Sequence, residues 1–461
     1  MKYLILLIFA SVMLTACKNN STNNQADNEE PIVIAPTFEC TDGFADGKYP
    51  CDNVDLMSIV TPQELEGLGE SEAATVNLND IWGWTDSQTG KEYALVGLTN
   101  AVSFVDISDP INPIVIGKLD ESNITAKYNV LSDPEYEACK IGIGSTEKAK
   151  SLETGSAWRD HKVFNDHLFI GSDAQPHGIQ VFDLIKLRSY NGTFLEFTQD
   201  ALYTGLANSH NVVINEETGF AYATGATNGA VCETGGLHII DINDPKNPTF
   251  AGCYEDTAPP RRRSNSAYIH DAQCVVYNGP DTDHTGSEVC FSSAEKSLII
   301  ADVTDKDSTR TLGFATDPNM SYSHQGWLTE DHSYFLMNDE LDEYNLGRTT
   351  KTYIFDVRDL DNPVFINYYE HNTESIDHNL YIKGDYVYAS NYISGLRILK
   401  MNDISSADLS LAAFFDSEPS VYASPNTQFE GTWSNYPYFQ SGIIITSDIN
   451  RGLFILQPDL D

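Results

Sequence analysis

The chain has 461 residues, of which 67 are acidic and 27 are basic, so its formal net charge is −40. Such a surface has no cationic excess with which to release counterions from nucleic acid, and we expect no nucleic-acid partner. The length suffices for several small domains or for one large domain built from repeats.

The N-terminal residues predict export and lipid attachment. Lys2 precedes an apolar run, residues 4–14, that is too short to cross a membrane as a helix. The sequence LTAC at 14–17 resembles the lipobox of bacterial lipoproteins, in which cleavage leaves the cysteine free to carry lipid. We therefore expect a signal peptide at 1–16 and a lipid on Cys17 that anchors the protein in the cell envelope, at the outer membrane and cell surface. The alternative is an ordinary signal peptide followed by an incidental cysteine.

The next segment, residues 17–39, is polar and contains two prolines. It has too little apolar surface to fold by itself, so we expect a disordered tether. No later segment is apolar enough to span a bilayer, and the repeats described next occupy residues 40–461.

Three short sequence motifs recur along the chain. One motif is GGLHIIDINDPKNP at 235–248, which has a second copy, NAVSFVDISDPINP, at 100–113. In a second motif, a histidine or tryptophan begins a β-branched or aromatic run. Four of these histidines, His210, His270, His324 and His378, are spaced by 60, 54 and 54 residues. A third, between them, is a short apolar run that ends in small and polar residues. Seven copies are found, which open at Trp82, His161, His210, His270, His324, His378 and Trp433.

Each copy predicts four short strands, with an Asp-Pro or Asn-Pro turn between the last two. Four short strands at this period are typical of a propeller blade. Immunoglobulin-like sandwiches would need longer repeats, and apolar residues at helical spacing, which helical solenoids require, are almost absent. The sequence therefore predicts an all-β, seven-bladed β-propeller in which the repeated Asp and Pro residues serve the turns.

The two ends of the chain predict how the ring closes. The last copy ends without its fourth strand, whereas an unassigned strand, VDLMSIV at 54–60, precedes the first copy. We expect this N-terminal strand to complete the last blade, which would remove two open sheet edges.

Seven cysteines follow Cys17 and indicate an oxidising compartment. Six lie near one another in pairs along the chain, and Cys139 is left over. Proximity makes the following pairs disulfide candidates: Cys40 with Cys51, Cys232 with Cys253, and Cys274 with Cys290.

On the basis of these repeated motifs, residues 40–457 resemble the choice-of-anchor B family, which consists of extracellular bacterial proteins built from LVIVD-type repeats. The resemblance depends most on NVDLMSIV, GGLHIIDINDPKNPTFAGCY, HQGWLTEDHSYFLMNDELDE and IDHNLY. It implies that members attach to cells by differing anchors, of which Cys17 would be the lipid version, and it implies no established enzymatic activity. His161 departs from the apolar residue expected at its position, and 258–265 looks like a local insertion.

The recurring histidines are candidate metal ligands. The first strand of each propeller blade lines the central channel, so equivalent imidazoles on successive blades would converge there and could bind a transition metal. Asp271 and Asp377 are candidate second-shell partners of these imidazoles. In the alternative, the histidines bond backbone carbonyls around the channel mouth. The candidate ligands are His210, His270, His324 and His378.

Two acidic stretches are further candidate cation sites. Asp281, Asp283 and Glu288 lie on a glycine-containing loop whose oxygen ligands suit calcium, although the spacing is not that of an EF-hand. The alternative is a solvated hairpin bracketed by Cys274 and Cys290. The second stretch follows a predicted second strand and could bind a cation or a substrate, or could be a solvated acidic loop; its residues are Asp339, Glu340, Asp342 and Glu343.

Long loops indicate a binding face on a rigid scaffold, with an insertion at 120–157 and one basic run, RRR at 261–263. No nucleophile elbow, P-loop or HExxH motif occurs. We therefore predict a binding or presentation module for an unknown extracellular protein or glycan. One alternative is a metal-dependent hydrolase or oxidoreductase that uses the histidine ring, and another is a calcium-stabilised adhesion module.

Overall fold

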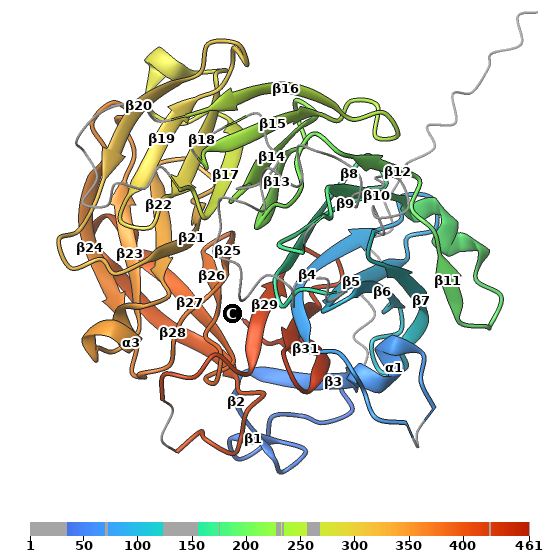
Figure 1. Cartoon of the computed structure of the whole chain (residues 1–461). Helices are drawn as coiled ribbons and strands as arrows, with labels where there is room; N and C mark the ends of the chain where they lie inside the picture. Colours follow the sequence, from blue (N-terminus) through green and yellow to red (C-terminus); the bar gives the residue numbers. More distant parts are fainter. Residues whose placement is uncertain are drawn as a thin grey trace, which may run out of the picture. The chain divides into compact units, whose positions relative to one another are not determined.

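The described strands form seven β-sheets in which nearly all neighbouring strands are antiparallel. We number these sheets as blades 1 to 7 in chain order (Figure 1). The computed structural model describes residues 35–69, 72–122, 155–174, 176–226, 232, 235–255, 268–423 and 426–460. All seven sheets belong to one unit, Ala35–Asp461. The all-β, seven-bladed β-propeller expected from the repeats is confirmed.

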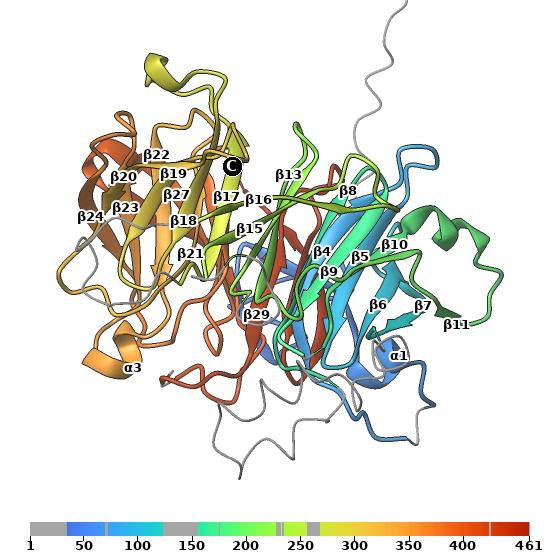
Figure 2. The ribbon, with the colours of Figure 1, turned by 45° about the horizontal axis from the view of Figure 1, so that its top comes forward.

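The innermost strand of each blade faces the centre of the ring. Each inner strand contacts the inner strands of the blades before and after it, and the last contacts the first. In the turned view of Figure 2, β13, β8 and β4 run side by side. The inner strands are β4 (Leu78–Thr85), β8 (Arg159–Phe164), β13 (Asn211–Asn215), β17 (Asp271–Val276), β21 (Ser323–Leu328), β25 (Leu380–Lys383) and β29 (Thr432–Tyr436).

The second and third strands form the middle of each blade. The second strands are β5 (Glu92–Leu98), β9 (His167–Ser172), β14 (Phe220–Thr224), β18 (Glu288–Ser293), β22 (Tyr334–Asp339), β26 (Tyr386–Ser390) and β30 (Ile444–Asp448). The third strands are β6 (Ala101–Asp106), β10 (Ile179–Asp183), β15 (Leu237–Asp241), β19 (Leu298–Asp302), β23 (Lys351–Asp356), β27 (Leu396–Asp403) and β31 (Gly452–Pro458).

The aspartate that ends six of the third strands has the structural role expected for it. Its Oδ1 accepts the backbone N–H two residues further on, at 3.0–3.1 Å. This side-chain bond stabilises the turn into the next strand. The six residues are Asp106, Asp183, Asp241, Asp302, Asp356 and Asp403.

The fourth strands lie on the outside of the blades. Blade 7 takes its fourth strand from the N-terminal part of the chain, because β3 pairs with β31 from Val54↔Pro458 to Val60↔Leu453. The ring thus closes as the sequence predicted. The fourth strands are β7 (Ile114–Asp120), β12 (Ala201–Tyr203), β16 (Thr249–Tyr254), β20 (Arg310–Ala315), β24 (Val364–Glu370), β28 (Asp408–Phe415) and β3 (Val54–Val60).

The apolar core lies between neighbouring blades. Phe104 of blade 1 stacks on Phe182 of blade 2, with ring centroids 4.8 Å apart. Phe291 and Phe335 stack in the same way between blades 4 and 5, at 5.8 Å. Burying one such side chain contributes roughly 1.5–3 kcal/mol, so the blade interfaces stabilise the ring.

A few short elements lie at the edges. The hairpin of β1 (Phe44–Ala45) and β2 (Tyr49–Asp52) extends blade 6, and β11 (Leu195–Phe197) pairs in parallel with β7. Within the described ranges, the helical segments are α1 (Pro62–Glu66), η3 (Leu184–Ser189), η4 (Thr282–His284), α3 (Asp342–Leu346) and η5 (Ile404–Ser406).

Several predictions fall on residues outside the described part. These are the signal peptide, Cys17, Cys139, the RRR run and most of the insertion at 120–157. Within the described residues, no helix combines the length and apolarity that crossing a membrane requires.

Candidate functional site

The four histidines predicted at the centre of the ring, called the hub histidines below, are held by a repeated backbone contact. The N–H groups of His210, His270 and His378 donate to the last residue of the second strand in the same blade, at 2.8–2.9 Å. His324 lies inside β21, where the pairing with β22 is shifted between Ser323 and Gly326. Such a bulge changes the direction in which side chains point.

The hub histidines lie next to one another in ring order. Centroid distances are 4.4 Å from His210 to His270, 4.2 Å from His270 to His324, and 4.1 Å from His324 to His378. The series continues to Trp433, whose ring lies 4.7 Å from that of His378. The structure therefore brings together all four imidazoles that the spacing had placed at one level.

Glu340, from the acidic stretch, reaches two of these imidazoles. Its Oε2 lies 3.8 Å from Nε2 of His324, and its Oε1 lies 3.8 Å from Nε2 of His378. We call His324, His378 and Glu340 the hub triad, and their nearest donor atoms could bind one metal ion. Two ligand atoms bound tetrahedrally to zinc lie about 3.4 Å apart. The separation between each Glu340 oxygen and the Nε2 atom that it faces is similar, at 3.8 Å.

Hydrogen bonds at Nδ1 fix the orientation of one triad imidazole. Nδ1 of His378 lies 2.7 Å from the carbonyl oxygen of Trp433. A carbonyl oxygen only accepts, so Nδ1 carries the proton, and the lone pair of Nε2 faces Glu340. His270 donates from Nδ1 to the carbonyl of His324 in the same way, at 2.9 Å. A neutral ring oriented by its second nitrogen is the form in which histidine binds metals.

Burial favours the neutral form of the triad imidazoles. It lowers the pKa of His378 to about 3 and the pKa of His324 below its usual range. It also raises the pKa of Glu340 to about 7, although the hydroxyl of Tyr392, which donates to Oε1 at 3.0 Å, opposes this rise. Imidazole lone pairs and the oxygens of the Glu340 carboxyl thus face one another, and a cation between them would stabilise the ionised carboxylate.

The triad is open to solvent through its carboxylate. The Glu340 side chain is 15% exposed, whereas His324 and His378 are 4% and 5% exposed. Further along the inner strands, Lys162 contacts Asp80 at 3.4 Å, and Asn379 donates to Asp80 at 3.2 Å. Polar groups from blades 1, 2 and 6 thus contact one another on the inner strands.

His210 has a different environment. Its Nδ1 lies 2.8 Å from a carboxylate oxygen of Asp173. Burial alone would lower the pKa of His210, but the bond to Asp173 raises it above its usual value. Asp173 follows the second strand of blade 2 as Glu340 follows that of blade 5. This shared position was the sequence signal that could have linked Glu340 to the hub.

Asp271 and Asp377 do not have the role expected for them. Asp271 accepts from the N–H of Ala272 at 2.7 Å, and the carboxylate of Asp377 has no hydrogen-bond partner in the described structure. Backbone carbonyls accept from Nδ1 of His270 and His378, and Nδ1 of His324 is buried without a hydrogen-bond partner in the described structure. The sequence did not predict the contacts of the Tyr392 hydroxyl and the Trp433 carbonyl, because neither group belongs to a metal-binding motif.

The acidic stretch is not the solvated loop that was its alternative interpretation. Asp339, Asp342 and Glu343 are buried. Asp339 accepts from the N–H groups of Ser321 and Tyr322, both at 2.5 Å. Of the four acidic residues, only Glu340 joins the hub triad.

The residues proposed from sequence for calcium have separate surroundings. Asp281 accepts from the N–H groups of Asp283 and Leu360, at 3.2 and 2.9 Å. It groups with His284 and Asp361, whose side chains lie 3.4 Å apart, rather than with Glu288.

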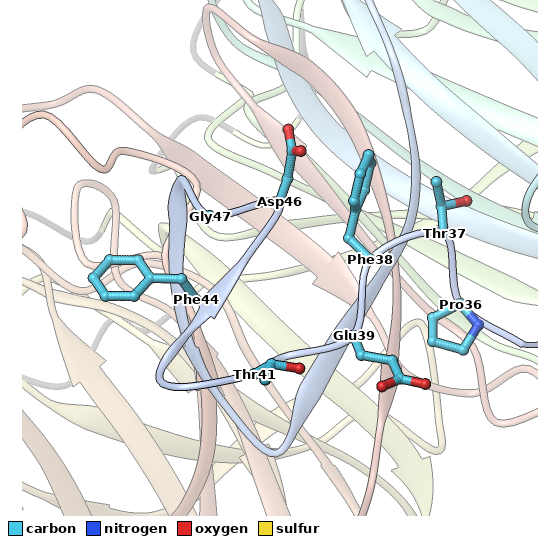
Figure 3. Close-up of a pocket in the computed structure, with 8 residues that line it drawn as sticks. All are labelled: Pro36, Thr37, Phe38, Glu39, Thr41, Phe44, Asp46 and Gly47. Atoms are coloured by element: carbon cyan, nitrogen blue, oxygen red, sulfur yellow. The ribbon is translucent and has the colours of Figure 1, made fainter.

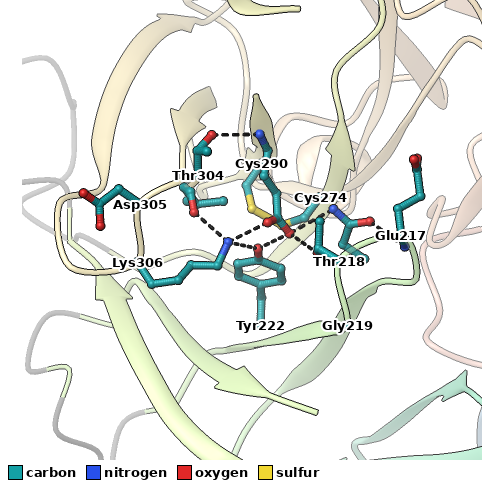
Figure 4. A network of polar contacts seen from close by, with 12 residues as sticks. Glu217, Thr218, Gly219, Tyr222, Cys274, Cys290, Thr304, Asp305 and Lys306 are labelled. Carbon is teal, nitrogen blue, oxygen red and sulfur yellow. Dashed lines mark hydrogen bonds and ion pairs between the residues drawn. A yellow bond between two sulfur atoms is a disulfide. The ribbon is translucent and has the colours of Figure 1, made fainter. Parts of the chain in front are cut away.

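Glu288 belongs to a buried network between blades 3 and 4. Figure 4 shows its partners Thr218, Tyr222 and Lys306. Its carboxylate pairs with Lys306 at 2.5 Å and accepts from the hydroxyl of Tyr222, also at 2.5 Å. Asn215 and Thr218 donate to it at 2.8 and 2.7 Å. Glu288 belongs to blade 4, whereas Asn215 and Tyr222 belong to blade 3, so this residue connects two blades.

All three candidate disulfides are present. The S–S distances are 2.06 Å for Cys40–Cys51, 2.02 Å for Cys232–Cys253 and 2.01 Å for Cys274–Cys290. Each cross-link joins segments within one blade or its edge hairpin.

An open depression lies at the N-terminal end of the described chain (Figure 3). Phe38 and Phe44 line it and are 38% and 43% exposed. It sits on the outer edge hairpin of blade 6, whereas the hub lies on inner strands. Its remaining lining residues are Pro36, Thr37, Glu39, Thr41, Asp46 and Gly47.

The fold and the hub define a class of protein: a repeat-built β-propeller with a histidine-lined centre. Two segments, residues 90–121 and 231–256, match the LVIVD repeat family. The first covers β5 to β7 of blade 1, and the second covers β15 and β16 of blade 3. No curated protein matches the chain. The match supports the repeat-containing propeller and is consistent with a binding module; the choice-of-anchor B family and the lipoprotein signal stay predictions.

Proposed function

We propose that the chain is a lipid-anchored binding module of the bacterial envelope whose hub binds a divalent transition-metal ion. The observation that carries this proposal is the approach of both Glu340 oxygens to the Nε2 atoms of His324 and His378, at 3.8 Å each. Imidazole suits zinc, copper, iron and nickel, and a carboxylate completes a three-ligand site.

Elemental analysis of the purified protein tests the metal. We expect one transition-metal ion per chain, which His324→Ala and Glu340→Gln should lose. His210→Ala is the matched control, because it removes an equivalent hub ring outside the triad and should keep the ion. A wild-type protein that takes up no zinc, copper, nickel or iron on dialysis would contradict the proposal.

The membrane anchor rests on the lipobox-like LTAC sequence that ends at Cys17. Cell fractionation with mass spectrometry tests it. We expect the mature chain to begin at a lipidated Cys17 and to sediment with outer membranes, and Cys17→Ser to move it to the soluble fraction. An unmodified Cys17 in a soluble wild-type protein would contradict this part of the proposal.

A glycan is the ligand class that we propose for this module. The buried ring of Tyr392, 5.0 Å from that of His378, is followed by two further rings: Tyr392 lies 5.5 Å from Phe429, which lies 6.3 Å from Tyr344. Phe429 and Tyr344 are 44% and 62% exposed. Rigid aromatic faces provide large contact area at low entropic cost, and sugar rings pack on them.

Binding to an array of extracellular glycans tests this ligand class. Phe429→Ala should weaken binding about tenfold, which corresponds to about 1.4 kcal/mol. Phe250, on β16, is 46% exposed, so Phe250→Ala is the matched control and should bind normally. Failure to bind any glycan, with capture of a specific surface protein through Phe429, would replace the glycan by a protein partner.

A metal-dependent enzyme is the second candidate function. The observation that favours it is that, within the described part of the chain, three protein groups form the triad; a three-ligand site leaves coordination positions for water or substrate. Metal-dependent turnover of ester or phosphoester substrates, lost in Glu340→Gln, would favour a hydrolase; dioxygen consumption would favour an oxidoreductase. Metal binding without turnover supports the binding module.

A further inference from the structure

A second group of potential metal ligands lies between blades 4 and 5 and shares no residue with the hub triad. Asp281 and His284 belong to the loop between β17 and β18 of blade 4, and Asp361 belongs to the turn between β23 and β24 of blade 5. One donor atom from each residue lies within 4.8 Å of the other two. We call these three residues the junction triad.

The imidazole of the junction triad is buried and faces an exposed carboxylate. His284 is 6% exposed, whereas the side chain of Asp361 is 58% exposed. Nε2 of His284 lies 3.4 Å from Oδ2 of Asp361. A good N–H···O hydrogen bond measures roughly 2.7–3.2 Å, and two ligand atoms on tetrahedral zinc lie about 3.4 Å apart. The two atoms are therefore spaced as ligands of one ion rather than as a strong hydrogen bond.

Backbone donors from both blades orient the second carboxylate, that of Asp281. The N–H of Asp283 donates to its Oδ1 at 3.2 Å, and the N–H of Leu360, in blade 5, donates to its Oδ2 at 2.9 Å. The N–H of Asp281 donates to the hydroxyl of Tyr277 at 3.1 Å. Tyr277 and Leu360 are buried in one apolar cluster. A carboxylate oxygen that accepts one hydrogen bond keeps a lone pair, and carboxylates that bind metals are usually hydrogen-bonded in this way.

Two departures from the repeat bring the junction triad together. The loop between β17 and β18 is longer than the equivalent loop in any other blade. Asp361 occupies a turn position that holds Ile111 in blade 1 and Lys246 in blade 3. The turn depends on Asp359, whose Oδ1 accepts from the N–H of Asn362 at 3.0 Å. The carboxylate of Asp361 is therefore not required for the turn.

We propose that the junction triad binds a zinc-class divalent ion that joins blades 4 and 5. Zinc takes histidine and aspartate ligands, and three protein ligands leave a fourth position for water. Calcium takes oxygen ligands, so the imidazole favours the zinc class. Because the Asp361 side is exposed, the ion exchanges with solvent. The site thus fills when zinc is supplied and adds to any ion that the hub retains on purification.

Calorimetric titration with zinc tests the proposal in the full chain carrying His324→Ala, which lacks a hub ligand. We expect one zinc ion to bind per chain. Asp361→Ala and His284→Gln should each weaken binding at least about a hundredfold, because loss of an outer-shell partner alone costs roughly 10- to 100-fold. The exposed position of Asp361 means that its removal leaves the fold intact.

Asp283→Asn is the matched control, because it neutralises a carboxylate of the same loop outside the junction triad and should keep zinc binding. Thermal unfolding gives a second readout. Zinc should raise the Tm of the His324→Ala protein, and this rise should disappear when Asp361→Ala is added. All comparisons are made without a complete hub triad, so failure of the hub proposal would leave these results unchanged.

Three outcomes overturn the inference. The first is a His324→Ala protein that takes up no zinc. The second is equally strong zinc binding in the Asp361→Ala and Asp283→Asn variants, which would assign the ion to the acidic surface in general. The third is displacement of the zinc by an equimolar amount of calcium, which would assign the site to hard cations.

Discussion

His161 illustrates a buried imidazole used as a structural donor. It lies on the inner strand of blade 2, is fully buried, and its Nε2 donates to the carbonyl of Leu95 at 2.8 Å. Its Nδ1 is buried without a hydrogen-bond partner in the described structure.

The same residue predicts a pH dependence of stability. Burial lowers the pKa of His161 to about 4, from about 6.5 in an unfolded chain. Between these values the unfolded state binds more protons, so the stabilisation is complete above pH 6.5 and is lost as pH falls toward 4. The loss amounts to about 3 kcal/mol. Urea unfolding at both pH values should show a smaller loss in His161→Gln; an equal loss would contradict the assignment.

The Glu288 network predicts the effect of removing one buried charge. Lys306→Met leaves the carboxylate without its cation and should lower the free energy of unfolding by about 3 kcal/mol. Lys246→Met is the control, because that lysine is 49% exposed in its pair with Asp183 and should change stability by less than about 1 kcal/mol. Denaturant unfolding measures both variants. Equal small effects would mean that the network contributes little.

At the scale of elements, the repeated third strand was predictable and the edge strands were not. The third strand carries its own turn signal, since its final aspartate bonds the following backbone. β11 and the β1–β2 hairpin are short, and their partners lie far away in sequence. Their pairing depends on where completed blades leave an open edge, which local periodicity does not encode.

Closure by β3 predicts the result of deleting residues 54–60. Leu56 and Met57 are each 1% exposed, and Leu56 packs in one cluster with Phe454 of blade 7. The deletion removes this packing and leaves β31 with an unpaired edge. We expect the Tm to fall by about 10 °C or more, and proteolysis to begin in blade 7. Deleting 18–34, in the predicted tether, is the control; unchanged stability on deleting 54–60 would refute closure.

At the scale of the whole molecule, repetition predicted the hub histidines but not the triad. Similar spacing within one repeated motif implies equivalent positions, so four equivalent imidazoles followed from the sequence alone. Their differences arise from single residues that break the repeat: Asp173 beside His210, and Glu340 beside His324 and His378. That Glu340 of blade 5 meets a residue of blade 6 depends on blade packing, which no local pattern specifies.

The net charge of −40 predicts that salt stabilises the folded ring. Mutual repulsion among carboxylates opposes the compact state more than the expanded one. Raising NaCl from about 0.1 M to about 1 M shortens the Debye length from about 10 Å to about 3 Å and screens this repulsion. The Tm should therefore rise, and a chelator must be present so that calcium makes no contribution.

Choline chloride at equal ionic strength separates general screening from sodium binding. An equal rise in both salts is expected if repulsion across the surface is the cause. A rise in NaCl alone would assign the effect to bound sodium. An unchanged or lower Tm in both salts would show that local pairs, such as Lys306 with Glu288, outweigh the net repulsion.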